Sequence, residues 1–320
     1  MKRRSLLGAV AALPLLSACG ARAAKDGGRP GAAAGRLAVG VIPVAHFAPI
    51  YIAQQEGYFA DEGLEVTTNV VQSSSAIVPS VINGQLQIGT SAGTPFVNPV
   101  AKNLPIRAVA PAGANPATAE EDTIAVLVAP GGPTDVRGLE GVPMAINAIG
   151  SQPHIAAAKV LLNSGGDPKK LQPIAMPMPD ALAAVQQGRV AAAAVAEPFV
   201  TLGLQRGARL LSPLYSSAFR STGAESVYFA SQDFIDERRD EVDAFRRALV
   251  KANRAANEDH DLLVGVLVSK LDMKEELARK MTPPTFAVDL EPDTLVEISE
   301  VMVETGFLTE PVAAEKLVIS

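Results

Sequence analysis

The sequence predicts an α/β protein built from two similar lobes. Short apolar strand-like runs alternate with helical stretches along most of the chain. The Gly and Pro residues that separate these elements recur in a similar order in the second half, and the last third is nearly all helical. Hydrophobic residues make up 48% of the 320, which is enough for a sizeable core. The net charge of −6 argues against a nucleic-acid partner, because such partners need basic surface.

The first residues indicate export from the cytoplasm. Lys2, Arg3 and Arg4 precede an apolar run from Leu6 to Leu16, and small residues follow. This order is typical of a signal peptide, here residues 1–18. The run is too short to span a bilayer, since a membrane helix needs about 20 apolar residues. The pair Arg3-Arg4 also resembles a twin-arginine signal, so the export route stays open.

Cys19, the only cysteine, follows Leu16-Ser17-Ala18, which resembles the lipobox of bacterial lipoproteins. The resemblance implies that the Cys19 sulfur carries diacylglycerol and that cleavage leaves Cys19 as the N-terminus. The alternative is an ordinary small apolar cysteine. Residues 19–36 are mostly Gly, Ala and Pro, so we expect a flexible tether. The chain would then be exported and lipid-anchored, at the outer face of the cytoplasmic membrane or in the periplasm.

The folded part is expected to start near Leu37. The apolar runs predict strands at 37–42, 64–71, 86–89, 106–110, 124–129, 144–148, 171–175, 190–196, 209–211 and 227–230. Helical stretches between and after them are predicted at 49–59, 76–82, 155–162, 180–187, 234–280 and 292–304. Alternation at this spacing implies parallel sheets covered by helices, with the helical tail packed on a sheet already made.

An internal echo supports two lobes of one design. Residues 81–86 match residues 185–190, and Pro95-Phe96-Val97 matches Pro198-Phe199-Val200. In both copies a helix ends at Gly, a buried strand follows, and Pro opens the next helix. The alternative is that the match is coincidental, because any α/β unit can have a Gly between a helix and the next strand.

At these residues the chain resembles the substrate-binding proteins of ABC importers for nitrate, sulfonates, taurine and thiamine precursors, a family related to the thiamine-pyrimidine synthases. The resemblance extends from about Leu37 to Leu211. It is carried by Ala48-Pro49-Ile50-Tyr51-Ile52-Ala53, Glu56-Gly57-Tyr58-Phe59, Glu62-Gly63-Leu64, Ile82-Asn83-Gly84-Gln85-Leu86-Gln87-Ile88-Gly89, Val136-Arg137-Gly138-Leu139-Glu140-Gly141, Ala183-Ala184-Val185-Gln186-Gln187-Gly188-Arg189-Val190 and Glu197-Pro198.

The resemblance implies a Venus-flytrap fold, the type II periplasmic-binding-protein fold. Lobe 1 would comprise 37–122 plus 225–320, lobe 2 would comprise 125–222, and two crossovers would form the hinge. It implies a protein that binds a small solute and passes it to an ABC permease, expected to be a monomer without cofactor or metal. An enzyme is not expected, because the sequence has no Gly-x-Ser-x-Gly elbow, no His-Glu-x-x-His helix and no counterpart of the synthases' cysteine-rich metal motif.

Open α/β sheets bind ligands outside the carboxyl ends of their strands. Polar residues that follow predicted strands are therefore candidates for ligand binding: Ser73, Ser74, Ser75, Thr90, Ser91, Ser151 and Gln152. Serines before a helix either cap it or hold a ligand's polar edge, and both alternatives stay open. Glycines near Thr90 and Ser91 would let the backbone approach a ligand, or only form a turn.

His46, Phe47 and Glu197 complete the candidate set. In thiamine-precursor binders a histidine occupies a place similar to that of His46, so the resemblance implies ligand contact there. His154 is less favoured, and His260 is assigned no role. Glu197 precedes Pro198 at a predicted helix start, where the helix dipole favours a carboxylate, so capping and ligand contact both stay open.

The predicted strand ends contain no Lys or Arg, and Glu197 adds a possible negative charge. An ionised sulfonate or nitrate would lose hydration there without a cationic partner. We therefore expect a neutral or weakly basic nitrogen heterocycle, similar to an aminopyrimidine, stacked on Phe47 and paired with His46, the serines and Glu197. Alternatives are a sulfonate, taurine or nitrate binder, an enzyme related to the thiamine-pyrimidine synthases, and an adhesive surface lipoprotein.

Overall fold

The computed structural model describes residues 35–71 and 74–319. The predicted signal peptide, Cys19 and Ser73 lie outside these residues. The predicted tether is too long at its end, because Gly35 and Arg36 already belong to a strand and pair with Leu64 and Glu65. Among the described residues, no helix has the length and apolarity that crossing a membrane requires.

The first sheet has the strand order β2-β1-β3-β10-β4. Strands β1, β2 and β3 run parallel, whereas β10 is antiparallel to both of its neighbours, β3 and β4. The strands are β1 Gly35–Val41, β2 Leu64–Val70, β3 Ile88–Ala92, β4 Ile106–Pro111 and β10 Ser226–Ser231.

The second sheet repeats this plan with the order β7-β6-β8-β5-β9. Here β5 is the reversed strand, antiparallel to β8 and β9, while β6 is parallel to β7 and β8. The strands are β5 Ile124–Val128, β6 Pro143–Ile146, β7 Gln172–Ala175, β8 Ala192–Ala196 and β9 Arg209–Pro213. The prediction of parallel sheets is therefore wrong for β5 and β10, since each sheet is mixed.

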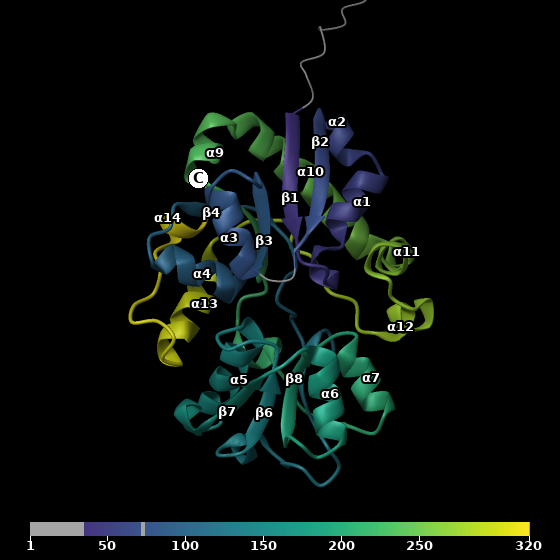
Figure 1. The fold of residues 1–320 in the computed structure, drawn as a ribbon, viewed down its shortest axis with the longest axis vertical. Coiled ribbons are helices and arrows are strands. Elements are labelled where there is room, and N and C mark those ends of the chain that lie inside the picture. The colour runs from purple at the N-terminus through teal and green to yellow at the C-terminus, as the bar shows by residue number, and fades with distance from the viewer. Residues whose placement is uncertain (1–34, 72–73, 320) are drawn as a thin grey trace, which may run out of the picture. The chain divides into compact units, whose positions relative to one another are not determined.

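Helices cover both sheets (Figure 1). Beside the first sheet lie α1 Pro49–Gln55, α2 Tyr58–Asp61, α3 Ser74–Ile82 and α4 Gly93–Ala101, with the 3₁₀ turn η1 Ala45–Phe47. The segment of the second sheet contains α5 Gln152–Asn163, α6 Met178–Gln186, α7 Phe199–Gln205, η2 Val136–Leu139 and η3 Pro168–Lys170, and α8 Tyr215–Ala218 follows it. The echo of residues 81–86 in residues 185–190 falls on equivalent connections, α3 to β3 and α6 to β8.

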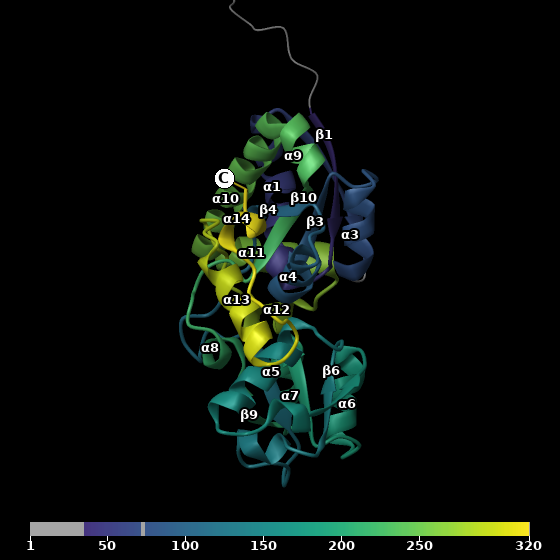
Figure 2. The ribbon, with the colours of Figure 1, turned by 90° about the vertical axis from the view of Figure 1, so that its left-hand side faces the viewer.

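The predicted helical tail consists of α9 Gln232–Glu237, α10 Arg239–Glu258, α11 His260–Leu271, α12 Glu275–Lys280, α13 Asp293–Glu304 and α14 Ala314–Leu317. Figure 2 shows α10 on the side of the first sheet opposite to α3. Its buried residues recur every three or four positions and include Val242, Phe245 and Leu249. The Phe245 ring stacks on Phe59 and meets the edge of Tyr228 of β10, so the tail closes the core over this strand.

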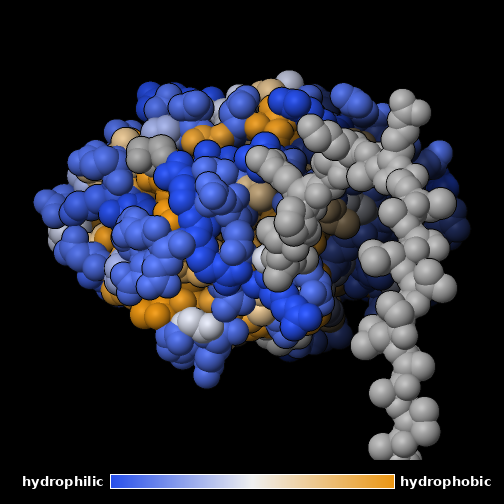
Figure 3. All heavy atoms as spheres, turned by 90° about the horizontal axis from the view of Figure 1, so that it is seen from above, coloured by the Kyte–Doolittle hydropathy of each residue, from blue (hydrophilic) through white to orange (hydrophobic). Residues whose placement is uncertain are grey.

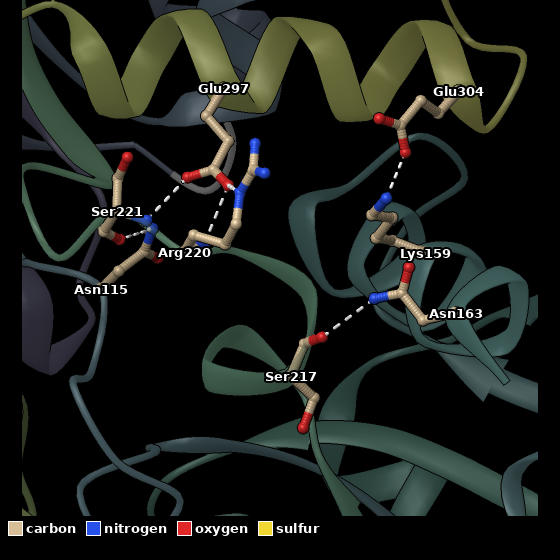
Figure 4. Close-up of polar contacts among 8 residues, drawn as sticks. All are labelled: Asn115, Lys159, Asn163, Ser217, Arg220, Ser221, Glu297 and Glu304. Atoms are coloured by element: carbon tan, nitrogen blue, oxygen red, sulfur yellow. Dashed lines mark hydrogen bonds and ion pairs between the residues drawn. The ribbon is translucent and has the colours of Figure 1, made fainter.

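Helix α13 extends the tail toward the second sheet (Figure 4). The Glu297 carboxylate accepts hydrogen bonds from the backbone N–H groups of Arg220 and Ser221, at 2.9 and 2.8 Å. At the C-terminal end of α13, Glu304 forms an ion pair with Lys159 of α5. The tail therefore contacts both the segment that leads into β10 and a helix of the second sheet. The lobe boundaries predicted from the sequence agree with the sheet memberships but stay a prediction.

The outer face of the protein seen in Figure 3 is mainly hydrophilic, with small separated hydrophobic patches among the described residues. Such scattered apolar side chains are normal on a protein surface.

Candidate functional site

The reversed strands decide which residues lie at the binding edge of each sheet. Because β10 is antiparallel to β3, its first residue Ser226 pairs with Ala92, the last residue of β3. Ile124 of β5 likewise pairs with Ala196, at the end of β8. Residues that precede these two strands therefore lie at the edge where the parallel strands end. This places Thr123 and Glu225 at the edge that binds ligands in open α/β sheets.

A group of five residues lies between the two sheets, and we call it the inter-sheet cluster: His46, Thr94, Thr123, Gln152 and Glu225. Its centre is the Gln152 amide, which is 1% exposed. Gln152 Oε1 accepts a hydrogen bond from Thr94 N at 3.1 Å, and Gln152 Nε2 donates one to Glu225 Oε2 at 2.8 Å. Since Gln152 opens α5 while Thr94 and Glu225 belong to the first sheet's edge, this amide bridges the two halves.

Glu225 is the one carboxyl of the inter-sheet cluster. It is 3% exposed, and burial raises its pKa to about 8, opposed by hydrogen bonds from Ser226 and Gln152 and reinforced by Asp122. At neutral pH the folded chain therefore holds this group mainly as a neutral carboxylic acid. From the sequence Glu225 is expected only at a domain boundary, because the residue precedes a strand and does not follow one.

His46 faces Glu225 from η1, as part of the loop that follows β1. Its Nε2 atom lies 3.3 Å from Thr123 Oγ1 and 3.9 Å from Glu225 Oε1. Burial lowers the pKa of His46 to about 4, so the imidazole is neutral at physiological pH. A neutral imidazole beside a neutral carboxyl offers a donor and an acceptor without net charge.

Two glycines keep the cluster compact. A Cβ on Gly113 would lie 2.5 Å from His46 Cδ2 and 2.8 Å from Glu225 Oε1. A Cβ on Gly93 would lie 2.9 Å from the Glu225 carbonyl oxygen and 3.0 Å from Gln152 Oε1. Real Cβ atoms essentially never approach as closely as the Gly113 distances, so the cluster needs this glycine.

A second acidic group lies near the cluster on the other crossover. Asp122 accepts hydrogen bonds from Ile124 N, Ser216 N and Ser216 Oγ, at 3.0, 2.8 and 2.9 Å. Burial raises the pKa of Asp122, and those hydrogen bonds oppose the rise. Burial, Glu225 and Asp122 together hold the pKa of Tyr215 well above its usual value. Asp122, like Glu225, precedes a strand and does not follow one, so a search of strand ends does not find it.

The hydroxyl groups of three predicted site residues, Thr90, Ser91 and Ser151, are engaged within the fold. Thr90 Oγ1 donates to Gly40 O and accepts from Ile42 N, which ties β3 to β1. Ser91 Oγ donates to Ala92 O. Ser151 Oγ donates to Asn147 Oδ1 and does not cap α5. Ser74 and Ser75 open α3.

The Phe47 ring does not face solvent. It is 2% exposed and meets the Tyr228 ring edge-on at a centroid distance of 5.8 Å. In this structure it packs in the core of the first sheet and presents no open face for stacking. His154, which the sequence analysis favoured less, is also engaged, since its Nδ1 accepts from Gly150 N and its ring packs against Phe307.

Glu197 is held by its own helix and by the tail. Its carboxylate accepts hydrogen bonds from Thr201 N at 3.0 Å, Thr201 Oγ1 at 2.8 Å and Thr282 N at 3.2 Å. Burial raises the pKa of Glu197, and the Thr201 and Thr282 bonds oppose the rise. Of the two alternatives, this geometry favours the capping role at the start of α7.

A surface depression of about 620 Å³ lies elsewhere, along one face of α10. Its lining includes Tyr58, Arg246, Arg247, Lys251 and Arg254, and none of the residues predicted from strand ends. Arg247 pairs with Glu62, and Lys251 pairs with Asp61. The inter-sheet cluster is the stronger candidate, because its groups are buried, come from both sheets and lie at the strand ends. No group of three or more His, Cys, Asp and Glu side chains among the described residues is placed to hold a metal ion.

Comparisons with known proteins agree with this geometry. The structure is similar to the periplasmic aliphatic sulphonate binding protein SsuA from Escherichia coli, with a TM-score of 0.73 and 17% identity over 89% of this chain and 97% of that one. It is similar to the alkanesulfonate-binding protein SsuA from Xanthomonas axonopodis pv. citri bound to MOPS, with a TM-score of 0.73 and 17% identity over 89% and 99% of the two chains.

The periplasmic nitrate-binding protein NrtA from Synechocystis PCC 6803 is also similar, with a TM-score of 0.68 and 14% identity over 85% of this chain and 82% of that one. These likenesses show the fold, a two-lobed α/β fold of the periplasmic-binding-protein type. No curated protein sequence matches the chain. The family model described as NMT1/THI5 like matches residues 44–261, more than half of the chain, and the chain therefore belongs to the NMT1/THI5-like family.

Proposed function

We propose that this chain is the extracytoplasmic solute-binding component of an ABC importer and is not an enzyme. The observation that carries the proposal is the inter-sheet cluster, where buried polar groups of both sheets meet at the edge that binds ligands in this class of fold. A solute held there contacts both halves, so its binding favours the closed form by its difference in affinity for the two forms. The neighbours named as binding proteins support the same role.

For the solute we favour a small neutral or weakly basic nitrogen heterocycle of the aminopyrimidine kind. The cluster contains two ionisable groups, Glu225 and His46, and neither is a permanent cation. Glu225 and His46 are both neutral at physiological pH, so the cluster supplies no positive charge to offset the hydration that an anion would lose on binding. The carboxyl and the imidazole offer donors and acceptors to a heterocycle's polar edge. This reasoning replaces Glu197, which caps α7, by Glu225 as the acidic partner.

The second candidate is a sulfonate or nitrate. It is favoured by the similar structures, two of which are sulfonate-binding proteins and one a nitrate-binding protein. An anion would lie near the amino ends of α4 and α5, where the helix dipoles favour negative charge, and at α4 it would have to displace Gln152 from the Thr94 N–H.

We also propose that Cys19 carries a lipid anchor and that the protein works outside the cytoplasm, as a monomer beside its permease. Membrane fractions of the native host test the anchor: acylated protein is extracted only with detergent, and Cys19→Ala releases the chain or leaves it unprocessed. An unmodified Cys19 in the mature native protein would rule the anchor out.

Calorimetry tests the solute class. Purified chain lacking residues 1–34 is titrated with 4-amino-2-methylpyrimidine and with taurine, methanesulfonate and nitrate. We expect the pyrimidine to bind unchanged and more tightly than any anion. Micromolar binding of an anion, with no binding of the pyrimidine, would select the second candidate. A solute that is converted would overturn the binding role in favour of catalysis, and native mass spectrometry of the protein with its copurified small molecules reads this out independently.

A further inference from the structure

We propose that the Gln152 amide is a built-in mimic of the solute: it occupies a recognition pair formed by Thr94 N–H and the Glu225 carboxyl, and this pair selects solutes that present an acceptor and a donor side by side. The inference rests on the proposed function and names the substrate class and specificity residues of the same site. The class comprises primary amides, amidines and amino-substituted nitrogen heterocycles.

The hydrogen-bond directions carry the argument. Thr94 N donates to the amide oxygen, and Glu225 Oε2 accepts from the amide nitrogen. A primary amide places its acceptor oxygen and donor nitrogen on one carbon. An aminopyrimidine places its ring nitrogen and exocyclic amino group on one carbon in the same way. The pair that fits the Gln152 amide therefore fits this heterocycle edge, whereas sulfonate and nitrate offer only acceptors.

Fixed geometry makes the pair selective. Thr94 N belongs to the first turn of α4, and Glu225 is held at the start of β10 beside Ser226 and His46. Both groups are buried, at 1% and 3% exposure, so an unpaired partner there is costly. A solute that lacks the donor leaves the Glu225 oxygen unpaired. A site of this kind discriminates strongly between a ligand and its analogue without the hydrogen-bonding group.

Gln152 competes with the solute for this pair. Its two hydrogen bonds link the halves without a solute, so part of the population is held in a form in which the pair is occupied. The apparent affinity for a solute falls by the fraction of protein in which the pair is free. Replacing the amide by an apolar side chain of similar size removes the competitor and leaves Thr94 and Glu225 in place.

The experiment uses two probes that differ in one group, 4-amino-2-methylpyrimidine and 2,4-dimethylpyrimidine. The dimethyl compound keeps the ring acceptors but lacks the amino donor. Calorimetry measures both on the wild type, on Gln152→Leu and on Glu225→Leu. The matched control is Gln186→Leu, which removes an exposed amide on α6. Thermal unfolding checks that each variant folds.

The wild type should bind the amino compound at least tenfold more tightly than the dimethyl compound. Gln152→Leu should bind the amino compound about fivefold more tightly than the wild type does, a factor that corresponds to one net hydrogen bond. Gln186→Leu should bind as the wild type does. In Glu225→Leu the two probes should bind equally.

Weaker binding of the amino compound by Gln152→Leu would show that Gln152 is an ordinary contact, and unchanged binding would show that it does not compete with the solute. Either result would overturn the inference while the proposed function stands. Equal binding of both probes to the wild type would overturn the recognition pair. Binding of taurine or nitrate with no binding of either pyrimidine would overturn the inference and the preferred solute class together, but leave the solute-binding role intact.

Discussion

Two glutamates next to strand ends have opposite fates in this protein. Glu197 follows β8, and Glu225 precedes β10. Glu197 is partly exposed and is satisfied by N–H groups of Thr201 and Thr282, so it stabilises the start of α7. Glu225 is buried against His46 and Gln152 and keeps its proton up to about pH 8. The residue that looks functional in the sequence makes the hydrogen bonds of a cap, and the one that looks like a boundary is the candidate binding group.

The contrast between the two glutamates arises because strand direction matters as much as strand order. In a parallel strand the binding edge is reached after the last residue, but in an antiparallel strand it is reached before the first. Glu225 and Thr123 precede the two reversed strands and therefore lie at the binding edges. Measurements on these carboxyls can test whether the two glutamates differ in this way.

The largest expected effect is the pH dependence of Glu225→Gln. The Glu225 carboxyl is protonated up to about pH 8 in the folded chain and up to about 4.5 when unfolded. The folded state thus binds more protons between these values, and stability falls as pH rises through the window. Glutamine does not titrate, so the variant should gain up to about 5 kcal/mol on the wild type, at about 1.4 kcal/mol per pKa unit. Urea unfolding at pH 5 and pH 8.5 measures this gain, and a pH-independent difference would contradict it.

The next effect concerns His46, with the opposite sign. The pKa of His46 is about 4 in the folded chain and 6.5 in the unfolded chain, so the unfolded state binds more protons between these pH values. Stability is present above pH 6.5 and is lost as pH falls toward 4. His46→Asn should therefore gain on the wild type on acidification, by up to about 3 kcal/mol. Equal acid sensitivity of the two proteins in urea unfolding would show that His46 titrates normally.

Glu197 should behave as a cap. Glu197→Gln weakens the hydrogen bonds from Thr201 and Thr282, and we expect a loss of about 1 kcal/mol of stability with unchanged solute affinity. Asp180→Asn is a matched control, because Asp180 lies exposed in the first turn of α6. Thermal unfolding and calorimetry together test the assignment. A loss of solute affinity in Glu197→Gln would restore ligand contact as its role.

The smallest effect is expected at the Lys159–Glu304 ion pair. The Glu304 side chain is 47% exposed, so solvent screens the pair. Glu304→Gln should cost less than about 1 kcal/mol, and the cost should vanish in high salt. Thermal unfolding at low and high ionic strength measures it. A larger, salt-independent loss would mean that α13 holds the second sheet's helix more firmly than an exposed ion pair does.

Most strands and helices could be predicted from the sequence, because each short apolar run reads as one buried strand. The prediction ended β3 at Gly89, whereas the strand continues to Ala92. Thr90 and Ser91 look like loop residues, but their hydroxyls bond to backbone and both are fully buried. The site was predicted less well. Gln152 and His46 were found, but local patterns do not reveal the direction of a strand, and Glu225 depends on it.

The segment that forms the second sheet is inserted, in the sequence, between two strands of the first, and this order affects how the protein is synthesised. All five strands of the second sheet lie within residues 124–213, between β4 and β10 of the first. As the chain grows from its N-terminus, the second sheet has all its strands before β10 of the first has been made. Until then β3 and β4 lack the strand that joins them. The cluster that includes Glu225 therefore cannot be complete before all strands of the second sheet have been made, and nascent chains that end before residue 225 have no complete recognition site.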